Sequence, residues 1–279
     1  MSDGKKAFLI DVSICNGCYC CQIACKDEHV GNDWTPYAKP EPDTGQFWLK
    51  LNEYVRGTVP KVKMHYVPVP CMHCDKAPCM PSCPVDAIYK RNDGMVVIDP
   101  VKCTGCKNCV DACPYSVIYF NDDLNLAQKC TGCAHILDGK GGGEGLPILP
   151  RCVDICPTGA IKFVDESSLT PAILKKAEVM KPELGTKPRV YYLNIPKKFV
   201  AGTVYDPIKK EVVIGATCSL SGNGSKKLSA TTDGFGDFWF EGLKEGTYSL
   251  TIEAKGFPSK TITKISTEKD VNLGDIALS

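Results

Sequence analysis

Apolar and polar residues alternate in short runs through the last third of the chain. The predicted strands lie at 200–205, 211–214, 216–220, 227–231, 236–240, 247–254, 261–265 and 271–278. Turn-forming pairs such as Asp233-Gly234 separate them, and short strands at this spacing are typical of a small sandwich or barrel. We therefore predict a small all-β domain over 197–279, after a boundary near residue 196.

The first 196 residues show a different pattern, in which short apolar runs alternate with cysteine-rich loops. Strands are predicted at 8–12 and 160–164, and strand-like runs lie at 46–51 and 62–69 of an insertion spanning 27–70. Two hairpins are predicted, one from 87–89 with 95–99 and one from 116–120 with 124–127. Each hairpin accompanies a cysteine loop, so we expect an α+β domain over 1–196.

A short helix is predicted near residue 170. Thr170 is placed to cap it and Pro171 to occupy its first position, while Ile173, Leu174 and Ala177 mark its apolar face. The helix is expected to end before Pro182, and an extended arm is expected at 181–196.

The cysteine content decides what kind of chemistry the first domain carries. The chain has 18 cysteines, and 17 of them lie between Cys15 and Cys156. The N-terminus reaches a charge after four apolar residues, which predicts no signal-peptide core, and no run approaches the roughly 20 apolar residues of a membrane span. We therefore expect these cysteines to be metal ligands rather than disulfide partners.

Two central runs have the spacing of iron-sulfur ligands, and each ends in Cys-Pro. In such runs the fourth cysteine ligates the other cluster of a pair. One run contains Cys71, Cys74, Cys79 and Cys83, and the other contains Cys103, Cys106, Cys109 and Cys113. If the fourth cysteine of each run joins the first three of the other run, two ligand sets are predicted. Set C is Cys71, Cys74, Cys79 and Cys113, and set D is Cys83, Cys103, Cys106 and Cys109.

Two outer runs repeat the arrangement around the central pair. The first contains Cys15, Cys18, Cys21 and Cys25, with Lys26 in place of proline, and the last contains Cys130, Cys133, Cys152 and Cys156, with its third position delayed. The same crossing predicts set A, which is Cys15, Cys18, Cys21 and Cys156, and set B, which is Cys25, Cys130, Cys133 and Cys152. The fold class predicted is therefore α+β, with two nested bacterial-ferredoxin-like units binding four 4Fe-4S clusters, followed by the small β domain.

Other features leave alternatives open. A zinc scaffold is the rival for the cysteines, although the triple spacing favours iron-sulfur chemistry. Cys20 is either a spare ligand or a packed thiol, and Cys218 is expected in the core of the β domain. His73 and His135 lie in cysteine loops, where they either hydrogen-bond cluster sulfur or are structural. The glycine-rich stretch 139–145 is expected to be a flexible loop rather than a nucleotide site.

Composition and motifs argue against two further classes of function, nucleic-acid binding and catalysis within this chain. The formal net charge is +1, and the aromatic residues are not interleaved with a basic stripe, so no nucleic-acid partner is expected. No complete catalytic triad, paired-carboxylate pocket or phosphate loop emerges, and no substrate-converting site is expected in this chain. A series of four clusters must receive electrons at one end and donate them at the other, so redox partners are implied.

The cysteine sets and several local motifs resemble the iron-sulfur subunits of the dimethyl-sulfoxide-reductase family of molybdopterin oxidoreductases. The motifs are Cys71-Met72-His73-Cys74, Ala127-Gln128-Lys129-Cys130-Thr131, Cys133-Ala134-His135 and the arm at 181–192. The arm and the β domain narrow the resemblance to the small subunits of the pyrogallol-phloroglucinol transhydroxylase branch. It implies a large partner subunit carrying molybdenum or tungsten with bis-molybdopterin guanine dinucleotide (bis-MGD). The β domain resembles the transthyretin-like fold of carboxypeptidase regulatory domains, which implies a packing or docking module.

One departure from that branch bears on function. Its small subunits lack the third cysteine run and carry three clusters, whereas Cys103, Cys106, Cys109 and Cys113 are all present here. The resemblance thus implies that electrons enter or leave the complex, as in a hydroxylase or a reductive dehydroxylase of polyhydroxylated aromatics. The alternatives are a subunit of a polysulfide or dimethyl sulfoxide reductase and a free-standing polyferredoxin. The expected setting is a cytoplasmic heterodimer that exchanges electrons with an external carrier, or else an exported complex whose partner carries a twin-arginine signal.

Overall fold

The chain divides into two compact units in the computed structural model, which describes residues 4–139, 148–222 and 224–279. One unit, here called the cysteine unit, comprises Met1–Glu53 and His65–Ile195. The other, called the β unit, comprises Tyr54–Met64 and Pro196–Ser279. The flexible loop predicted at 139–145 lies outside the described residues from position 140 onward.

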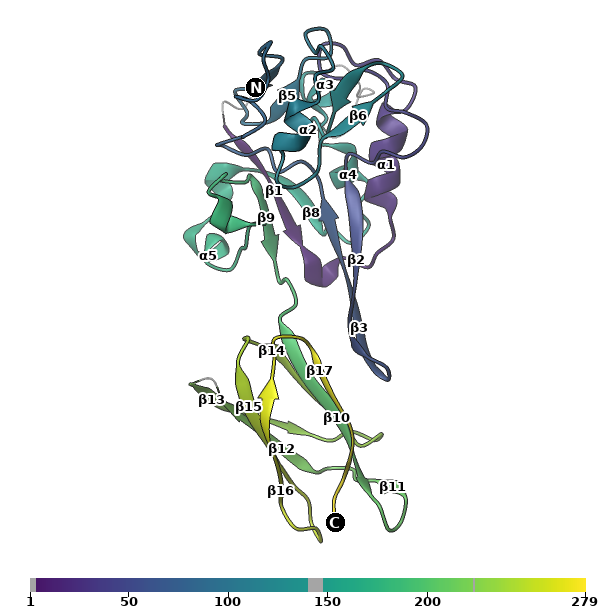
Figure 1. Cartoon of the computed structure of the whole chain (residues 1–279), viewed down its shortest axis with the longest axis vertical. Coiled ribbons are helices and arrows are strands. Elements are labelled where there is room, and N and C mark those ends of the chain that lie inside the picture. The colour runs from purple at the N-terminus through teal and green to yellow at the C-terminus, as the bar shows by residue number, and fades with distance from the viewer. Residues whose placement is uncertain (1–3, 140–147, 223) are drawn as a thin grey trace. The chain divides into compact units, whose positions relative to one another are not determined.

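A three-stranded sheet forms the base of the cysteine unit. Its central strand β1 (Lys6–Asp11) pairs antiparallel with β8 (Ile161–Asp165) and parallel with β9 (Val190–Leu193). Figure 1 shows β1 between β8 and β9. The arm expected at 181–196 is extended only in part, because Pro182–Leu184 forms a 3-10 turn. Its later residues join the sheet as β9, where Val190 and Tyr192 are completely buried.

Two small hairpins and several short helices carry the cysteine loops. The hairpins are β4 (Ile88–Lys90) with β5 (Val96–Ile98) and β6 (Tyr119–Asn121) with β7 (Leu126–Gln128). The α-helices are α1 (Cys20–His29), α2 (Asn108–Ala112), α3 (Ala134–Leu137), α4 (Arg151–Asp154) and α5 (Pro171–Leu174). Single 3-10 turns lie at Val12–Ile14, Glu166–Ser168 and Pro182–Leu184.

The helix predicted near residue 170 is α5, and it is shorter than its apolar pattern suggested. Thr170 caps it by accepting a hydrogen bond from the backbone N–H of Ile173 at 3.4 Å, and Pro171 occupies the first position. The α-helix ends at Leu174, because the chain turns through Lys175 and then pairs Glu178 with Tyr192 in an isolated bridge.

The insertion forms a long hairpin of β2 (Lys50–Thr58) and β3 (Lys61–Val69). The strand expected at 46–51 is wrong in position, since β2 begins only at Lys50. The apolar signal came from Trp48 and Leu49, which are buried in irregular chain before the strand. The hairpin also divides between the units, because Tyr54–Met64 belongs to the β unit.

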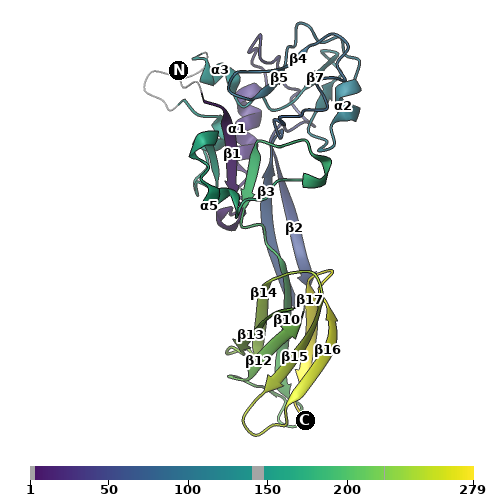
Figure 2. The same cartoon turned by 90° about the vertical axis from the view of Figure 1, so that its left-hand side faces the viewer.

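The C-terminal part of the β unit is a two-sheet sandwich. One sheet combines β10 (Lys198–Asp206), β11 (Glu211–Val212), β14 (Asp237–Leu243) and β17 (Val271–Ala277), and the other has the order β13 (Ser225–Thr231), β12 (Thr217–Gly222), β15 (Thr247–Glu253), β16 (Lys260–Ser266). Figure 2 labels most of these strands from the side. Alternate residues of both sheets, such as Val204, Leu220, Phe238 and Leu250, fill one apolar core.

Candidate iron-sulfur sites

The first two cysteines of each run enclose a Cys-x-x-Cys loop, and these four loops share one backbone feature. The residue before the second cysteine has a left-handed conformation in each loop, with φ of 72° at Gly17, 42° at His73, 74° at Gly105 and 66° at Gly132. Glycine adopts this conformation at no steric cost, which explains three of the four positions. The turn directs backbone N–H groups at sulfur, as where His73 donates to Cys71 Sγ at 3.4 Å and Gly132 to Cys130 Sγ at 3.4 Å.

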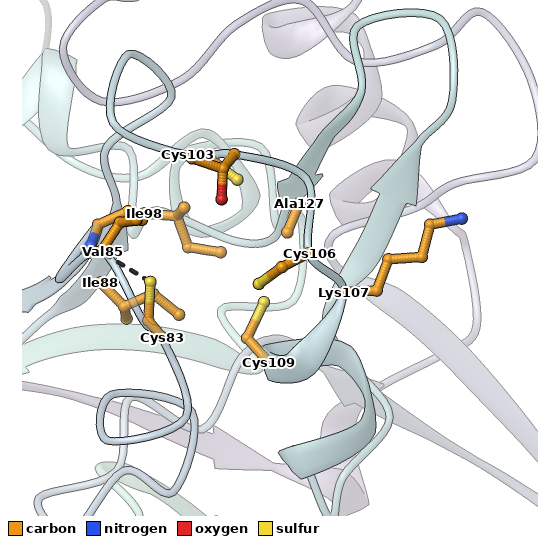
Figure 3. Close-up of a pocket in the computed structure, with 11 residues that line it drawn as sticks. Cys83, Val85, Ile88, Ile98, Cys103, Cys106, Lys107, Cys109 and Ala127 are labelled. Atoms are coloured by element: carbon orange, nitrogen blue, oxygen red, sulfur yellow. Dashed lines mark hydrogen bonds between the residues drawn. The ribbon is translucent and has the colours of Figure 1, made fainter.

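Set D surrounds a cavity of about 300 Å³, here called cavity D. Figure 3 shows the sulfur atoms of the set D cysteines directed into one space, while the Lys107 side chain points away from it. Apolar residues that include Val85, Ile88 and Ile98 complete the wall. The backbone N–H of Ala87 donates to Cys83 Sγ at 3.3 Å, a contact that stabilises negative charge on the thiolate.

Sets C and A surround two further cavities. Cavity C has a volume of about 320 Å³, and its lining includes all four set C cysteines with Met72, Val96, Tyr115 and Ile118. Cavity A has a volume of about 280 Å³, and its lining includes all four set A cysteines. Leu51 and Pro68 also line cavity A, so the insertion covers part of that site.

Set B lies where α1 and α4 pack together. Burial raises the pKa of Cys25 well above its usual value, and the neighbouring thiols of Cys130, Cys133 and Cys152 raise it further. Cys152 also interacts with Cys21 of set A, and Cys130 with Cys71 of set C. Set B is therefore the neighbour of both sets, and sets C and D are joined by the short segments Cys79–Cys83 and Cys109–Cys113. The order in space is A, B, C, D.

Exposure changes along this order. Cys18 in set A and Cys106 in set D are exposed, whereas all four cysteines of set B are buried. In set C three cysteines are buried and Cys113 is half-buried. The two ends of the series thus approach the surface, and its centre is enclosed by protein.

The donor chemistry of the sets fits iron-sulfur clusters. Burial raises the pKa of Cys21, Cys79 and Cys133 to about 12, and neighbouring cysteines contribute in the same direction, so these thiols become thiolates only beside bound metal. A single zinc ion draws its sulfur ligands to about 2.3 Å. Within the described ranges, no group of three or more His, Cys, Asp and Glu side chains is placed to bind a single metal ion. Four thiols around an apolar cavity instead suit a 4Fe-4S cluster.

His135, Glu28 and Arg151 form a hydrogen-bonded cluster near set B that the sequence did not reveal. His135 Nε2 lies 2.8 Å from Glu28 Oε1, and Arg151 Nε donates to Glu28 Oε2 at 2.7 Å. Trp34 stacks on the His135 ring with centroids 4.3 Å apart, and the ring of His29 meets it edge-on at 5.4 Å. The partners lie more than 100 residues apart in the chain, so no local sequence motif could predict these contacts.

His73 has one ring nitrogen available beside set C. Its Nδ1 accepts a hydrogen bond from the backbone N–H of Val96 at 3.0 Å, which leaves the proton on Nε2. That Nε2 is buried and has no hydrogen-bond partner within the part of the chain that the structure describes. A buried N–H group without a partner is costly, and a cluster sulfur is an acceptor that would satisfy it.

The two remaining cysteines lie outside the four sets. Cys218 is fully buried in β12, within the apolar core of the sandwich. Cys20 is half-buried at the start of α1, and a hydrogen bond with the Cys18 thiol raises the pKa of Cys20.

Comparison with known proteins agrees with these features. Residues 62–166 match the model of the 4Fe-4S dicluster domain, and residues 200–279 match that of the carboxypeptidase regulatory-like domain. The chain belongs to the iron-sulfur subunits of the dimethyl-sulfoxide-reductase family of molybdopterin oxidoreductases, which transfer electrons.

Three relatives illustrate the range of that family. The chain is 40% identical to the pyrogallol hydroxytransferase small subunit of Pelobacter acidigallici, an alignment that covers 97% of this chain and 98% of the relative. It is 37% identical to a tetrathionate reductase subunit of Salmonella typhimurium, over 70% of this chain and 75% of that one. It is 32% identical to the arsenate respiratory reductase iron-sulfur subunit of a Shewanella species, over 68% of this chain and 96% of that one.

Proposed function

We propose that this chain binds four 4Fe-4S clusters and conducts electrons for a molybdenum or tungsten bis-MGD enzyme acting on polyhydroxylated aromatics. The ligands proposed for the outer pair are Cys15, Cys18, Cys21 and Cys156 in set A, and Cys25, Cys130, Cys133 and Cys152 in set B. Those proposed for the central pair are Cys71, Cys74, Cys79 and Cys113 in set C, and Cys83, Cys103, Cys106 and Cys109 in set D. The clusters, when bound, each carry one electron at a time. The chain itself supplies the cysteine ligands, encloses the central clusters and sets the distances between clusters.

The change of exposure along the series carries this proposal. A conductor needs redox centres near the surface at both ends and protected centres between them. Cys18 and Cys106 are exposed at the two ends, and set B is buried in the middle. Cavities A, C and D each bring together the four cysteines of one set, although those cysteines come from two separate runs. This crossing supports two nested ferredoxin-like pairs.

The substrate class is proposed from the relative named for pyrogallol. Its similarity extends over 97% of this chain, including the β unit. The complete third run, whose four cysteines all line cavities C and D, favours net electron transfer through this subunit. We therefore favour a hydroxylase or reductive dehydroxylase over an internal transfer of a hydroxyl group. The large catalytic subunit and an external electron carrier are the partners this function requires.

A reductase of inorganic oxyanions or a similar small acceptor is the second candidate. The similarity to the tetrathionate and arsenate reductase subunits supports it, since those alignments cover about two thirds of this chain. Within the described residues, no helix is long and apolar enough to span a membrane. A cytoplasmic location remains a prediction.

Anaerobic isolation of the native complex is the first test. Iron, molybdenum and tungsten would be quantified per small subunit, and about sixteen iron with a co-purifying large subunit is the expected result. For a hydroxylase, adding pyrogallol, resorcinol or phloroglucinol to the oxidised complex should then produce the electron paramagnetic resonance (EPR) signals of reduced clusters. For a reductive dehydroxylase, adding these compounds to the dithionite-reduced complex should remove those signals. Tetrathionate or arsenate that instead reoxidises the dithionite-reduced complex would favour the second candidate.

Ligand variants identify which set is loaded. Cys106→Ser should lower the iron content from about sixteen to about twelve, because one cluster loses a ligand. Cys218→Ser, in the core of the β unit, should keep the full iron content. A fully loaded chain that purifies without a large subunit would support the free polyferredoxin and overturn the proposed enzyme partnership.

A further inference from the structure

Lys129 is a buried cation for which the described residues provide no carboxylate partner. It directly follows β7, directly precedes Cys130 of set B, and is only 2% exposed. Its ammonium group donates to the carbonyl oxygens of Val96 and Cys130, the latter at 3.0 Å. Within the described residues it takes part in no ion pair.

The other buried cations of the described chain are neutralised by carboxylates. Arg189 is 1% exposed and contacts Asp75 at 2.8 Å and Glu166 at 3.1 Å. Lys61 is buried in the β unit and is ion-paired with Asp237. An isolated positive charge inside a protein carries a large desolvation cost. The described residues provide no carboxylate for Lys129, so its buried charge favours a negatively charged group bound nearby.

The position of Lys129 identifies where that negative charge lies. On one side its neighbour along the chain is Cys130 of set B. On the other side Val96 accepts its hydrogen bond, and the Val96 side chain lines cavity C. The charge of Lys129 also interacts electrostatically with Cys79 of set C and with Cys130 of set B. Lys129 thus interacts with one ligand of set C and one of set B.

We propose that the Lys129 ammonium group is the fixed counter-charge that favours reduction of the two central clusters, those of sets B and C. The inference rests on the proposed function, because it requires both sets to hold clusters. Reduction adds negative charge, and seven of the eight cysteines of sets B and C are buried, so solvent stabilises that charge less there than at sets A and D. A buried cation offsets this penalty and raises the reduction potentials of both clusters. Electrons can then cross the enclosed centre of the series.

The test is an EPR-monitored redox titration of the anaerobically purified, iron-quantified complex. Lys129→Gln keeps a donor for the two carbonyl groups and removes the charge. It should lower two of the four midpoint potentials while the iron content stays at the wild-type value. Lys129→Arg, which keeps the charge, should leave the midpoints close to wild type. Lys107→Met is the matched control at cavity D, because that side chain is 55% exposed and solvent screens it.

Each outcome bears on the proposal. Wild-type midpoints in a fully loaded Lys129→Gln variant would overturn it, as would equal shifts in the Gln and Arg variants. Lys129→Met serves as a second neutral variant if Lys129→Gln does not assemble. Loss of iron from both neutral variants, with full loading of Lys129→Arg, would also overturn it in favour of a role in assembly. A missing large subunit, or the absence of a cluster from set A or D, would contradict the proposed function. The midpoint potentials of the clusters in sets B and C could still be compared between wild type and the Lys129 variants.

Discussion

Arg189 donates two hydrogen bonds to the same carboxylate oxygen of Asp75, from Nε at 2.9 Å and from Nη2 at 2.8 Å. Asp75 follows Cys74 of set C, and Arg189 lies directly before β9. Two backbone bonds reinforce the contact, from Arg189 to Met72 at 2.9 Å and from Asp75 to Lys187 at 2.8 Å. The arm is therefore fastened to the loop that holds two cysteines of set C.

We expect Asp75→Asn to loosen this loop. The substitution leaves the buried guanidinium of Arg189 with Glu166 as its one anionic partner among the described residues. Because Asp75 itself is 33% exposed, the expected loss is about 1–3 kcal/mol. Anaerobic urea unfolding followed by cluster absorbance measures the change. Lys102→Gln is the control, because Lys102 is 64% exposed and its 4.0 Å pair with Asp99 contributes at most about 1 kcal/mol. Equal urea midpoints for Asp75→Asn and wild type would contradict the prediction.

The second prediction concerns Asp270, which joins the hairpin tip to the sandwich inside the β unit. It accepts hydrogen bonds from Arg56 Nε at 2.9 Å and Nη2 at 2.6 Å, and from the backbone N–H of Phe199 at 3.0 Å. Asp270→Asn should destabilise the β unit by about 3 kcal/mol, because Arg56 is largely buried there. Limited proteolysis within 54–64 and thermal unfolding report the effect.

The matched control for Asp270 is Glu241, which pairs with Lys63 on the same unit. The side chains of Lys63 and Glu241 are substantially exposed, at 40% and 55%, so Glu241→Gln should change stability by at most about 1 kcal/mol. If Glu241→Gln proved as damaging as Asp270→Asn, burial would not be what makes the Arg56 contact stabilising.

Local patterns predicted much of the fold and of the cysteine grouping. Hairpins, the Thr170 cap and most sandwich strands follow from alternation and turn residues, which act over a few positions. The spacing of the cysteines led to sets A, C and D, and the cysteines of each set line one cavity. Ligation of iron by those sets remains a prediction.

Long-range features could not be predicted in this way. Arg56 and Asp270 are 214 positions apart, and Glu28 and His135 are 107 apart, so no periodicity links them. The uncompensated charge of Lys129 was equally hidden, because the burial of one lysine depends on how β5, β7 and the cysteine loops pack together. The apolar run around Trp48 was misplaced as a strand because a buried loop and a strand give the same local signal.

The third prediction tests the left-handed turn in the loop of set D. Gly105 has φ of 74°, and a Cβ atom there would lie 2.5 Å from the backbone oxygen of Asn125. Gly105→Ala should therefore lose iron from set D and destabilise the chain by more than the roughly 1–2 kcal/mol of the backbone conformation alone. Gly159→Ala separates the two causes, because the φ of Gly159 is 65° but no atom of the described residues lies within 4 Å of a Cβ placed there. Full iron loading in Gly105→Ala would show that the loop shifts without affecting the site.

The last prediction concerns the pH dependence of stability. The side chain of Glu41 is fully buried and lies 3.2 Å from Lys26 Nζ, and burial raises the pKa of this carboxyl from 4.5 to about 7 against the opposing effect of Lys26. The folded state therefore binds a proton that the unfolded state has already released between pH 4.5 and 7. Stability from this group is fully present below pH 4.5 and is lost as pH rises through 7.

Glu41→Gln, which mimics the protonated carboxyl, should remove that loss. Wild type should unfold at a lower urea concentration at pH 8 than at pH 6, and the variant should show a smaller difference between the two. Asp43→Asn, an exposed carboxylate two positions away, controls for the general effect of removing one negative charge. Because cluster loss also depends on pH, the comparison between variants at each pH carries the result. An unchanged pH response in Glu41→Gln would mean that Glu41 stays ionised in the folded chain, held by Lys26.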